Sequence, residues 1–170
     1  MSAAEISQFD ELYRTHRRRV ARLCLGYCGG DAATADDLLQ EVFLRVWLNL
    51  SEFRNEAALS TWLYRICVNT CLQWVRTAKR RPEQPGLALP DVPAPAPDAQ
   101  AAQLARLHRA LARLPEADRL LMMLVLDDLP YARIAEICDQ TEGNIRVRLH
   151  RIRQRLTQLV QQLPDEDDES

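Results

Sequence analysis

A run of basic and amide side chains lies between Ser60 and Arg81, in a stretch without Asp or Glu. Its polar residues recur at steps of three or four, which puts them on one helix face; they are Arg65, Asn69, Gln73, Arg76 and Arg80. Exposed helices ordinarily mix charge signs, so a cationic face with an amide among the arginines suits a phosphate backbone and unstacked bases. A basic surface helix without a ligand is the alternative that this stretch by itself leaves open.

A second basic run follows near the C-terminus, with no acidic residue between Gly143 and Leu163. Apolar residues at helical spacing, among them Ile145, Leu149 and Ile152, predict a long helix there that Thr141 caps. A short predicted helix over 131–138 precedes it. A short helix, a turn and a longer basic helix are typical of a DNA-binding helix-turn-helix, and the alternative is a plain helical hairpin.

The sequence predicts an all-α protein, whose helices position these two basic runs. Apolar residues at helical spacing predict helices over 6–28, 31–50, 60–81, 99–114 and 115–125, the third of them capped by Ser60 or Thr61. Six of the nine prolines fall between Pro82 and Asp98, which predicts an extended linker. The sequence therefore predicts two small helical domains, 1–81 and 99–163, joined by a Pro-rich linker at 82–98 and followed by an acidic tail at 164–170.

The net charge of −2 over 170 residues conceals a segregation, because five acidic residues lie together at positions 165–169. Without them the chain carries +3, and the tail is either a solubilising segment or a competitor of DNA for the last basic helix. No apolar run approaches the roughly 20 residues that a membrane span needs. We expect a cytoplasmic protein with no membrane insertion.

Five cysteines and three histidines are the candidate metal ligands. Cys24 and Cys28, and Cys67 and Cys71, are pairs spaced by four on predicted helices, so zinc binding or redox sensing is one interpretation. Most of these cysteines lie in apolar stripes, which favours simple packing. No phosphate-binding glycine loop, nucleophile motif or convergent carboxylate pair is present, so we expect no catalytic residue, no cofactor and no enzyme.

Taken together, the two halves resemble bacterial RNA polymerase sigma factors of the extracytoplasmic-function group. The first half carries the resemblance in Ala35-Asp36-Asp37-Leu38-Leu39-Gln40-Glu41-Val42-Phe43, Phe53-Arg54, Thr61-Trp62-Leu63-Tyr64-Arg65-Ile66 and Val68-Asn69. The second half carries it in Leu114-Pro115-Glu116, Ile134-Ala135-Glu136-Ile137 and Thr141-Glu142-Gly143-Asn144-Ile145-Arg146-Val147-Arg148-Leu149-His150-Arg151.

For the first domain, sigma-2, the resemblance implies binding to the polymerase clamp and recognition of the promoter −10 element. Polymerase binding would use Asp37, Gln40 and Glu41 of the second helix. The −10 residues would be Arg65, Asn69, Gln73, Arg76, Lys79 and Arg80. Of these, Asn69 would hold a base turned out of the duplex, because its amide offers donor and acceptor together.

For the second domain, sigma-4, the resemblance implies docking on the polymerase flap and reading of the −35 element in the major groove. The implied DNA-binding residues are Thr141, Asn144, Arg146, Arg148, His150 and Arg151. It also implies an anti-sigma partner beside core RNA polymerase and promoter DNA. The turn departs from many relatives in having Asp139 and Gln140, which predicts a looser turn.

Two questions stay open at this stage. A stand-alone helix-turn-helix regulator would use the second half in the same way without polymerase. The linker also permits many placements of one domain relative to the other.

Overall fold

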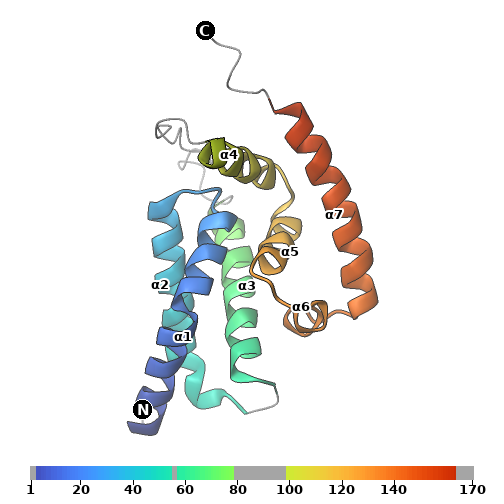
Figure 1. The fold of residues 1–170 in the computed structure, drawn as a ribbon. Coiled ribbons are helices and arrows are strands. Elements are labelled where there is room, and N and C mark those ends of the chain that lie inside the picture. Colours follow the sequence, from blue (N-terminus) through green and yellow to red (C-terminus); the bar gives the residue numbers. More distant parts are fainter. Residues whose placement is uncertain (1–2, 55–56, 79–98, 164–170) are drawn as a thin grey trace.

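Residues 3–54, 57–78 and 99–163 are described by the structure, which is a computed structural model. They form seven α-helices and one short 3-10 helix (Figure 1). The elements are α1 (Ala3–Tyr27), α2 (Ala32–Asn49), η1 (Leu50–Glu52), α3 (Leu59–Ala78), α4 (Ala99–Ala112), α5 (Glu116–Leu126), α6 (Tyr131–Cys138) and α7 (Glu142–Gln162). No helix in these described ranges has both the length and the apolar character to cross a membrane. The predicted linker and acidic tail lie outside the described residues.

The first three helices pack side by side as a bundle, drawn from blue to green in Figure 1. Asp31 begins α2, as predicted, because its carboxylate accepts hydrogen bonds from the backbone N–H groups of Ala33 and Thr34. Aromatic rings close one end of the bundle, with centroid distances of 4.9 Å between Phe9 and Trp47 and 4.7 Å between Tyr13 and Phe43. The first half thus has the helical bundle that its apolar spacing predicts.

The start of α3 differs from the prediction. Ala58 already accepts a hydrogen bond from the N–H of Trp62 at 3.1 Å, so α3 begins at Leu59 and neither Ser60 nor Thr61 is its cap. Both hydroxyls face the second half of the chain instead. Ser60 accepts a hydrogen bond from Arg133, and the Oγ1 of Thr61 lies 3.5 Å from the Glu136 carboxylate. Sequence spacing alone could not show that these hydroxyls have partners so far along the chain.

Helices α6 and α7 form the helix-turn-helix unit of the second half. The turn is tighter than predicted, because Asp139 adopts a left-handed backbone conformation with φ of 53° and the Gln140 N–H reaches the Ala135 carbonyl at 3.0 Å. Thr141 caps α7 as predicted, accepting from the N–H of Asn144 at 3.2 Å. Ile145 and Leu149 are fully buried beneath it.

The two halves share one continuous hydrophobic core, which the sequence left undecided. Helix α5 lies against α1 and α3, and α6 lies against α3 (Figure 1). Gly26 of α1 marks the closest approach, since a Cβ at this position would stand 2.0 Å from the Met123 methyl group of α5. The chain is therefore closed, with its second half packed on its first.

Candidate nucleic-acid and polymerase interfaces

Arg65, the first predicted −10 residue, is bound to the second half of the chain. Its Nε and Nη2 both donate to the backbone carbonyl of Glu136, at 3.0 and 2.8 Å. This carbonyl lies in the last turn of α6, where the helix dipole favours a cation. In the closed arrangement the guanidinium of Arg65 is thus engaged within the chain.

Asn69 lies one turn farther along α3, with its side chain exposed. It borders a cavity of about 400 Å³ between the halves, whose other walls include Leu72 of α3, Leu121 of α5 and the turn residues Asp139 and Gln140. The lining mixes apolar side chains with charged and amide side chains from both halves, so this cavity belongs to the closed arrangement of the chain.

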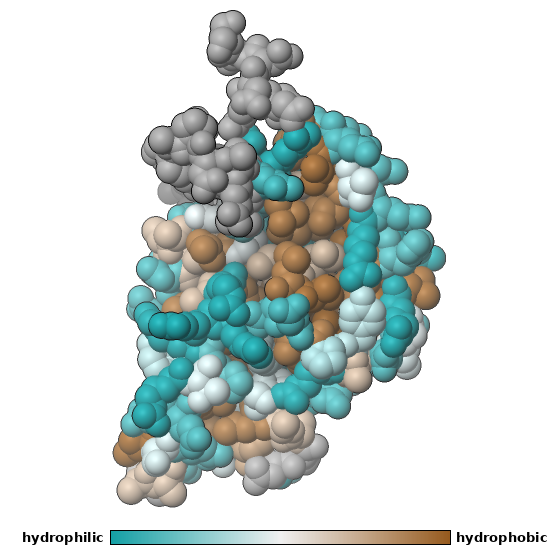
Figure 2. Space-filling view, in the orientation of Figure 1, coloured by the Kyte–Doolittle hydropathy of each residue, from teal (hydrophilic) through white to brown (hydrophobic). Residues whose placement is uncertain are grey.

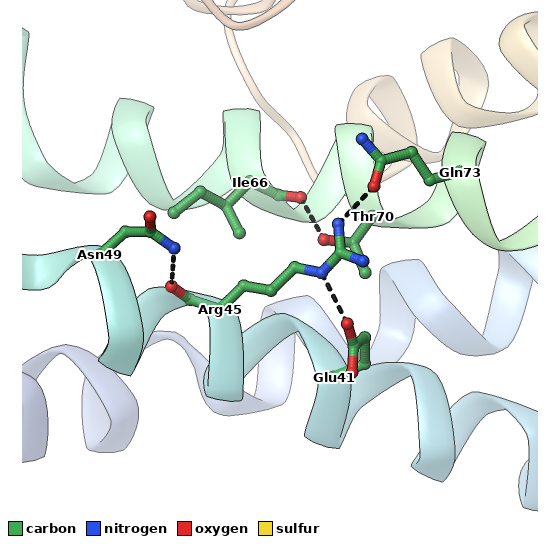
Figure 3. Close-up of polar contacts among 6 residues, drawn as sticks. All are labelled: Glu41, Arg45, Asn49, Ile66, Thr70 and Gln73. Atoms are coloured by element: carbon green, nitrogen blue, oxygen red, sulfur yellow. Dashed lines mark hydrogen bonds and ion pairs between the residues drawn. The ribbon is translucent and has the colours of Figure 1, made fainter.

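Gln73 is joined to α2 through Arg45 (Figure 3). The Nη1 of Arg45 donates to the Gln73 amide oxygen at 2.5 Å, while its Nε donates to Glu41 at 2.6 Å. One arginine therefore connects a predicted −10 residue with a predicted polymerase-binding residue. Of the other −10 candidates, Arg76 lies in α3 with its side chain undescribed, and Lys79 and Arg80 lie outside the described residues.

The outer face of α2 combines acidic and apolar side chains. Asp37 and Gln40 are exposed and Glu41 is half-exposed. The same face continues at helical spacing with Leu44 and Leu48, which are 52% and 65% exposed. Neither leucine was predicted as a functional residue, although both fall outside the buried stripe of α2 at steps of four. An exposed pair of large apolar residues beside carboxylates is typical of a protein-binding surface.

The six predicted −35 residues differ in what their side chains are free to do. Thr141 serves as the cap of α7, and Arg148 is held by Asp118 of α5 at 2.7–2.8 Å. Arg146 pairs with Glu142 one turn earlier and lies over the ring of Tyr131. Five of the six are exposed, and Arg148 is the half-buried exception; the exposed residues are Thr141, Asn144, Arg146, His150 and Arg151.

Val147 belongs to the same exposed face of α7 and was not predicted as a site residue. It is 56% exposed, between the basic side chains. An exposed β-branched residue among cations on a recognition helix can contact the methyl group of thymine. The sequence could have identified Val147 by its spacing, because it falls on a different helix face from the buried residues Ile145, Leu149 and Ile152.

A hydrophobic surface lies over α5 and between α4 and α7 (Figure 2). The half-buried apolar side chains of this half include Leu107, Leu129, Leu156 and Leu159. On α5, Leu126 is 48% exposed. This surface is separate from the basic face at the start of α7.

Asp127 is the main polar link between the halves. It is 8% exposed and its carboxylate accepts from Arg22 of α1 at 2.5 Å, with Arg19 at 3.8 Å and the hydroxyl of Tyr64 at 3.4 Å. Burial, and then the charge of Asp127, raise the pKa of Tyr64 to about 12. The sequence predicted no role for Asp127, which follows the predicted helix over 115–125.

Arg119 of α5 forms a second polar link. Its guanidinium donates to the Tyr27 carbonyl of α1 at 2.9 Å and to the Leu111 and Leu114 carbonyls near the end of α4 at 3.0 and 3.1 Å. Burial lowers the pKa of Arg119, and the carbonyl oxygens around it satisfy its donors. One buried cation thus joins α1, α4 and α5.

Within the described residues, one group of three or more metal-ligating side chains is close enough to hold an ion. It consists of Cys24 of α1 and Cys67 and Cys71 of α3, all fully buried. Cys28 lies one turn from Cys24 but is not part of the group. The packing interpretation correctly predicted burial of these cysteines.

Comparison with known proteins places these features in a family. Residues 12–81 match the family model for sigma-70 region 2, and residues 104–156 match the model for sigma-70 region 4. The two matches cover the α1–α3 bundle and the helix-turn-helix half.

Two relatives that match along most of this chain support the same family. The chain is 36% identical over 154 residues to the ECF RNA polymerase sigma factor SigM of Mycobacterium tuberculosis, covering 89% of this chain and 76% of SigM. It is 32% identical over 170 residues to the ECF RNA polymerase sigma-E factor of Escherichia coli K12, covering 91% and 87% of the two chains.

Two solved structures share the fold. One is the sigma factor RpoE of Bartonella quintana in complex with the anti-sigma factor NepR, with a TM-score of 0.73 and 21% identity over 92% of this chain and 99% of the other. The other is CnrH in complex with the cytosolic domain of CnrY, with a TM-score of 0.66 and 21% identity over 90% and 87%. With both sigma-70 regions in order, the exposed basic face of α7 and relatives above 30% identity over most of their length, the chain belongs to the ECF family of RNA polymerase sigma factors.

Proposed function

We propose that this sigma factor binds core RNA polymerase with α2, the −10 element with α3 and the −35 element with α7. The observation that carries the proposal is the pair of basic stretches in the sequence, 60–81 and 143–163, each in the half that matches the corresponding sigma-70 region. Such a protein works beside polymerase in the cytoplasm and needs no chemistry or cofactor of its own.

At the −35 element, the first three turns of α7 enter the major groove. Arg146, His150 and Arg151 contact phosphates and base edges, and arginine can bind guanine with two hydrogen bonds. Asn144 offers an amide, and Val147 an apolar contact for thymine. Arg148 acts mainly within the protein, because Asp118 already holds its guanidinium.

At the −10 element, Asn69 binds the edge of an unpaired base, and the cations of the same helix hold the phosphates. Those cations are Arg65 and Arg76, with Gln73 on the same helix, and the proposal extends to Lys79 and Arg80, which lie outside the described residues. Turning out a base costs a few kcal/mol, which a cationic groove with a polar reading group can offset. Arg65 becomes available to DNA only when its hydrogen bonds to the Glu136 carbonyl break.

On α2, the polymerase-binding surface extends from Asp37, Gln40 and Glu41 to Leu44 and Leu48. Burial of two exposed leucines supplies the apolar centre that a stable protein contact needs, and the acidic residues supply its charged rim. The hydrophobic surface over α5 and between α4 and α7 is a second polymerase contact, made by the region 4 half.

An anti-sigma factor is the expected regulator. Structural neighbours include a sigma factor in complex with an anti-sigma factor, which supports the same kind of partner for this chain. Such a partner would cover the exposed apolar residues that polymerase otherwise binds.

Run-off transcription with bacterial core polymerase on a promoter library tests the proposal. We expect initiation that requires this protein and is selective for promoter sequence, and we expect Asn69→Ala to weaken it. Gln8→Ala, which removes an exposed amide on α1, is the matched control and should leave initiation unchanged. Specific DNA binding by the protein alone, with no initiation from any core enzyme, would instead favour a stand-alone helix-turn-helix regulator.

A further inference from the structure

Three cysteine sulfurs meet in the core between α1 and α3. The Sγ atoms of Cys24, Cys67 and Cys71 all lie within 4.8 Å of one another. None of the three residues has any exposed surface. They come from positions 43 and 47 residues apart in the chain, so only the packing of α1 on α3 brings them together.

The two helices hold these sulfurs in a defined arrangement. Cys67 and Cys71 are separated by four residues and therefore share one face of α3. Cys24 faces them from α1. Next to the cluster, the hydroxyl of Tyr27 donates to the Cys71 carbonyl at 3.1 Å, which ties α1 to α3 at this level. The geometry is thus set by backbone and helix packing.

The sulfurs interact as donors and acceptors rather than only filling space. Hydrogen bonds from the thiols of Cys67 and Cys71 lower the pKa of Cys24 to about 5, and the same contact raises the pKa of both donors. Cys28 is equally buried one turn away, outside the cluster, and burial raises its pKa to about 12. What qualifies the cluster as a ligand set is its geometry, because three buried Sγ atoms within 4.8 Å of one another offer three ligand atoms to one ion.

We propose that Cys24, Cys67 and Cys71 bind a soft thiophilic cation, copper(I), through their three sulfur atoms. Sulfur ligands select copper(I), zinc or iron–sulfur clusters over harder cations. Structural zinc sites and iron–sulfur clusters take four protein ligands, whereas this group has three. A closed-shell monovalent ion accepts three thiolates and needs no water ligand, which suits a site without solvent access.

Two consequences follow from the buried position. Each sulfur that binds as a thiolate releases its proton, so copper affinity should rise with pH. An ion bound to both helices also stabilises the folded chain, because the unfolded chain lacks the assembled site. The ion enters when α1 and α3 separate locally, as buried groups become accessible in native proteins.

The test is an anaerobic titration of the full-length protein with copper(I) in competition with bathocuproine disulfonate. We expect one copper ion per chain to resist the chelator, a sulfur-to-copper charge-transfer band in the ultraviolet, and three sulfur scatterers by X-ray absorption. Cys24→Ser should abolish the chelator-resistant copper. Cys28→Ala, a matched buried cysteine, and Cys138→Ala should retain it.

Several results would overturn the proposal. One is that the wild-type protein yields all its copper to the chelator and gains no thermal stability from the ion. Another is that Cys28→Ala loses as much copper binding as Cys24→Ser. Tighter zinc binding that requires Cys28 would indicate a four-thiolate site instead. Should Cys24→Ser not fold by circular dichroism, the X-ray absorption of the wild type still decides, because fewer than three sulfurs contradicts the assignment.

Discussion

The arginines of this protein differ in availability according to the partner that each finds in the folded chain. Arg65 binds the carbonyl end of α6, and Arg148 binds Asp118 of α5. Arg151 extends from α7 into solvent. Residue type alone therefore does not identify the DNA-binding cations, because a guanidinium that is already paired must lose that partner before it can bind a phosphate.

At the residue scale we first compare two arginines of α7. Arg151→Ala should weaken −35 binding and reduce the slope of log affinity against log salt by about 1, the loss of one phosphate contact. Arg148→Ala should leave the salt slope unchanged, because its charge is neutralised by Asp118. Fluorescence anisotropy of −35 DNA with the polymerase holoenzyme, at several salt concentrations, measures both. An equal reduction of the slope in the two variants would refute the assignment.

A second prediction at this scale concerns alkaline pH. Tyr64 has its pKa raised from 10.0 to about 12, so the folded chain holds the phenolic proton more tightly than the unfolded chain. Its contribution to the free energy of unfolding is complete below pH 10 and is lost as pH rises toward 12, by about 2–3 kcal/mol in all. Urea unfolding across this pH range should show a smaller loss in Tyr64→Phe. A loss as large as in the wild type would contradict the prediction.

At the scale of elements, the ends of the helices determine where the functional side chains stand. The left-handed Asp139 ends α6, and two residues later Thr141 begins α7. These local devices set the angle between the two helices, so they also orient the exposed face of α7. The −35 residues depend on this turn as much as on their own side chains.

Removing the α7 cap should therefore affect both stability and DNA binding. Thr141→Ala should lower the free energy of unfolding by about 1 kcal/mol, and it should weaken −35 binding because the first turn of α7 frays. Thr157→Ala is the control, since that hydroxyl only donates to the Arg153 carbonyl within α7. Urea denaturation and anisotropy measure the two effects. If Thr157→Ala matched Thr141→Ala in both, capping would not be the cause.

At the scale of the whole molecule, the closed arrangement brings the second half of the chain against the proposed −10 face of α3. The α6 end occupies Arg65, and α5 and the turn at 139–140 wall the cavity beside Asn69. Promoter DNA that contacts α3 must displace these parts of the second half. Under the proposed function, the buried contacts around Asp127 and Arg119 would therefore oppose −10 recognition in the closed chain.

Loss of the Asp127 charge should shift the chain toward open forms. Asp127→Asn weakens the contacts with Arg22 and Arg19, so we expect a larger radius of gyration in small-angle X-ray scattering and faster proteolysis between the halves. Asp128→Asn is the matched control, because Asp128 is exposed and asparagine tolerates its φ of 58°. A radius unchanged in Asp127→Asn would show that the Asp127 charge is not needed to hold the halves together.

By itself, the sequence determined the helices, the caps at Asp31 and Thr141 and the presence of two basic faces. Such features depend on neighbours three or four residues apart, which spacing displays directly. Spacing could not predict contacts between residues that lie far apart in the chain. The partner of Arg65, the ion pairs of Asp127 and the meeting of Cys24 with Cys67 and Cys71 were decided by tertiary structure, because each depends on which helices share a core.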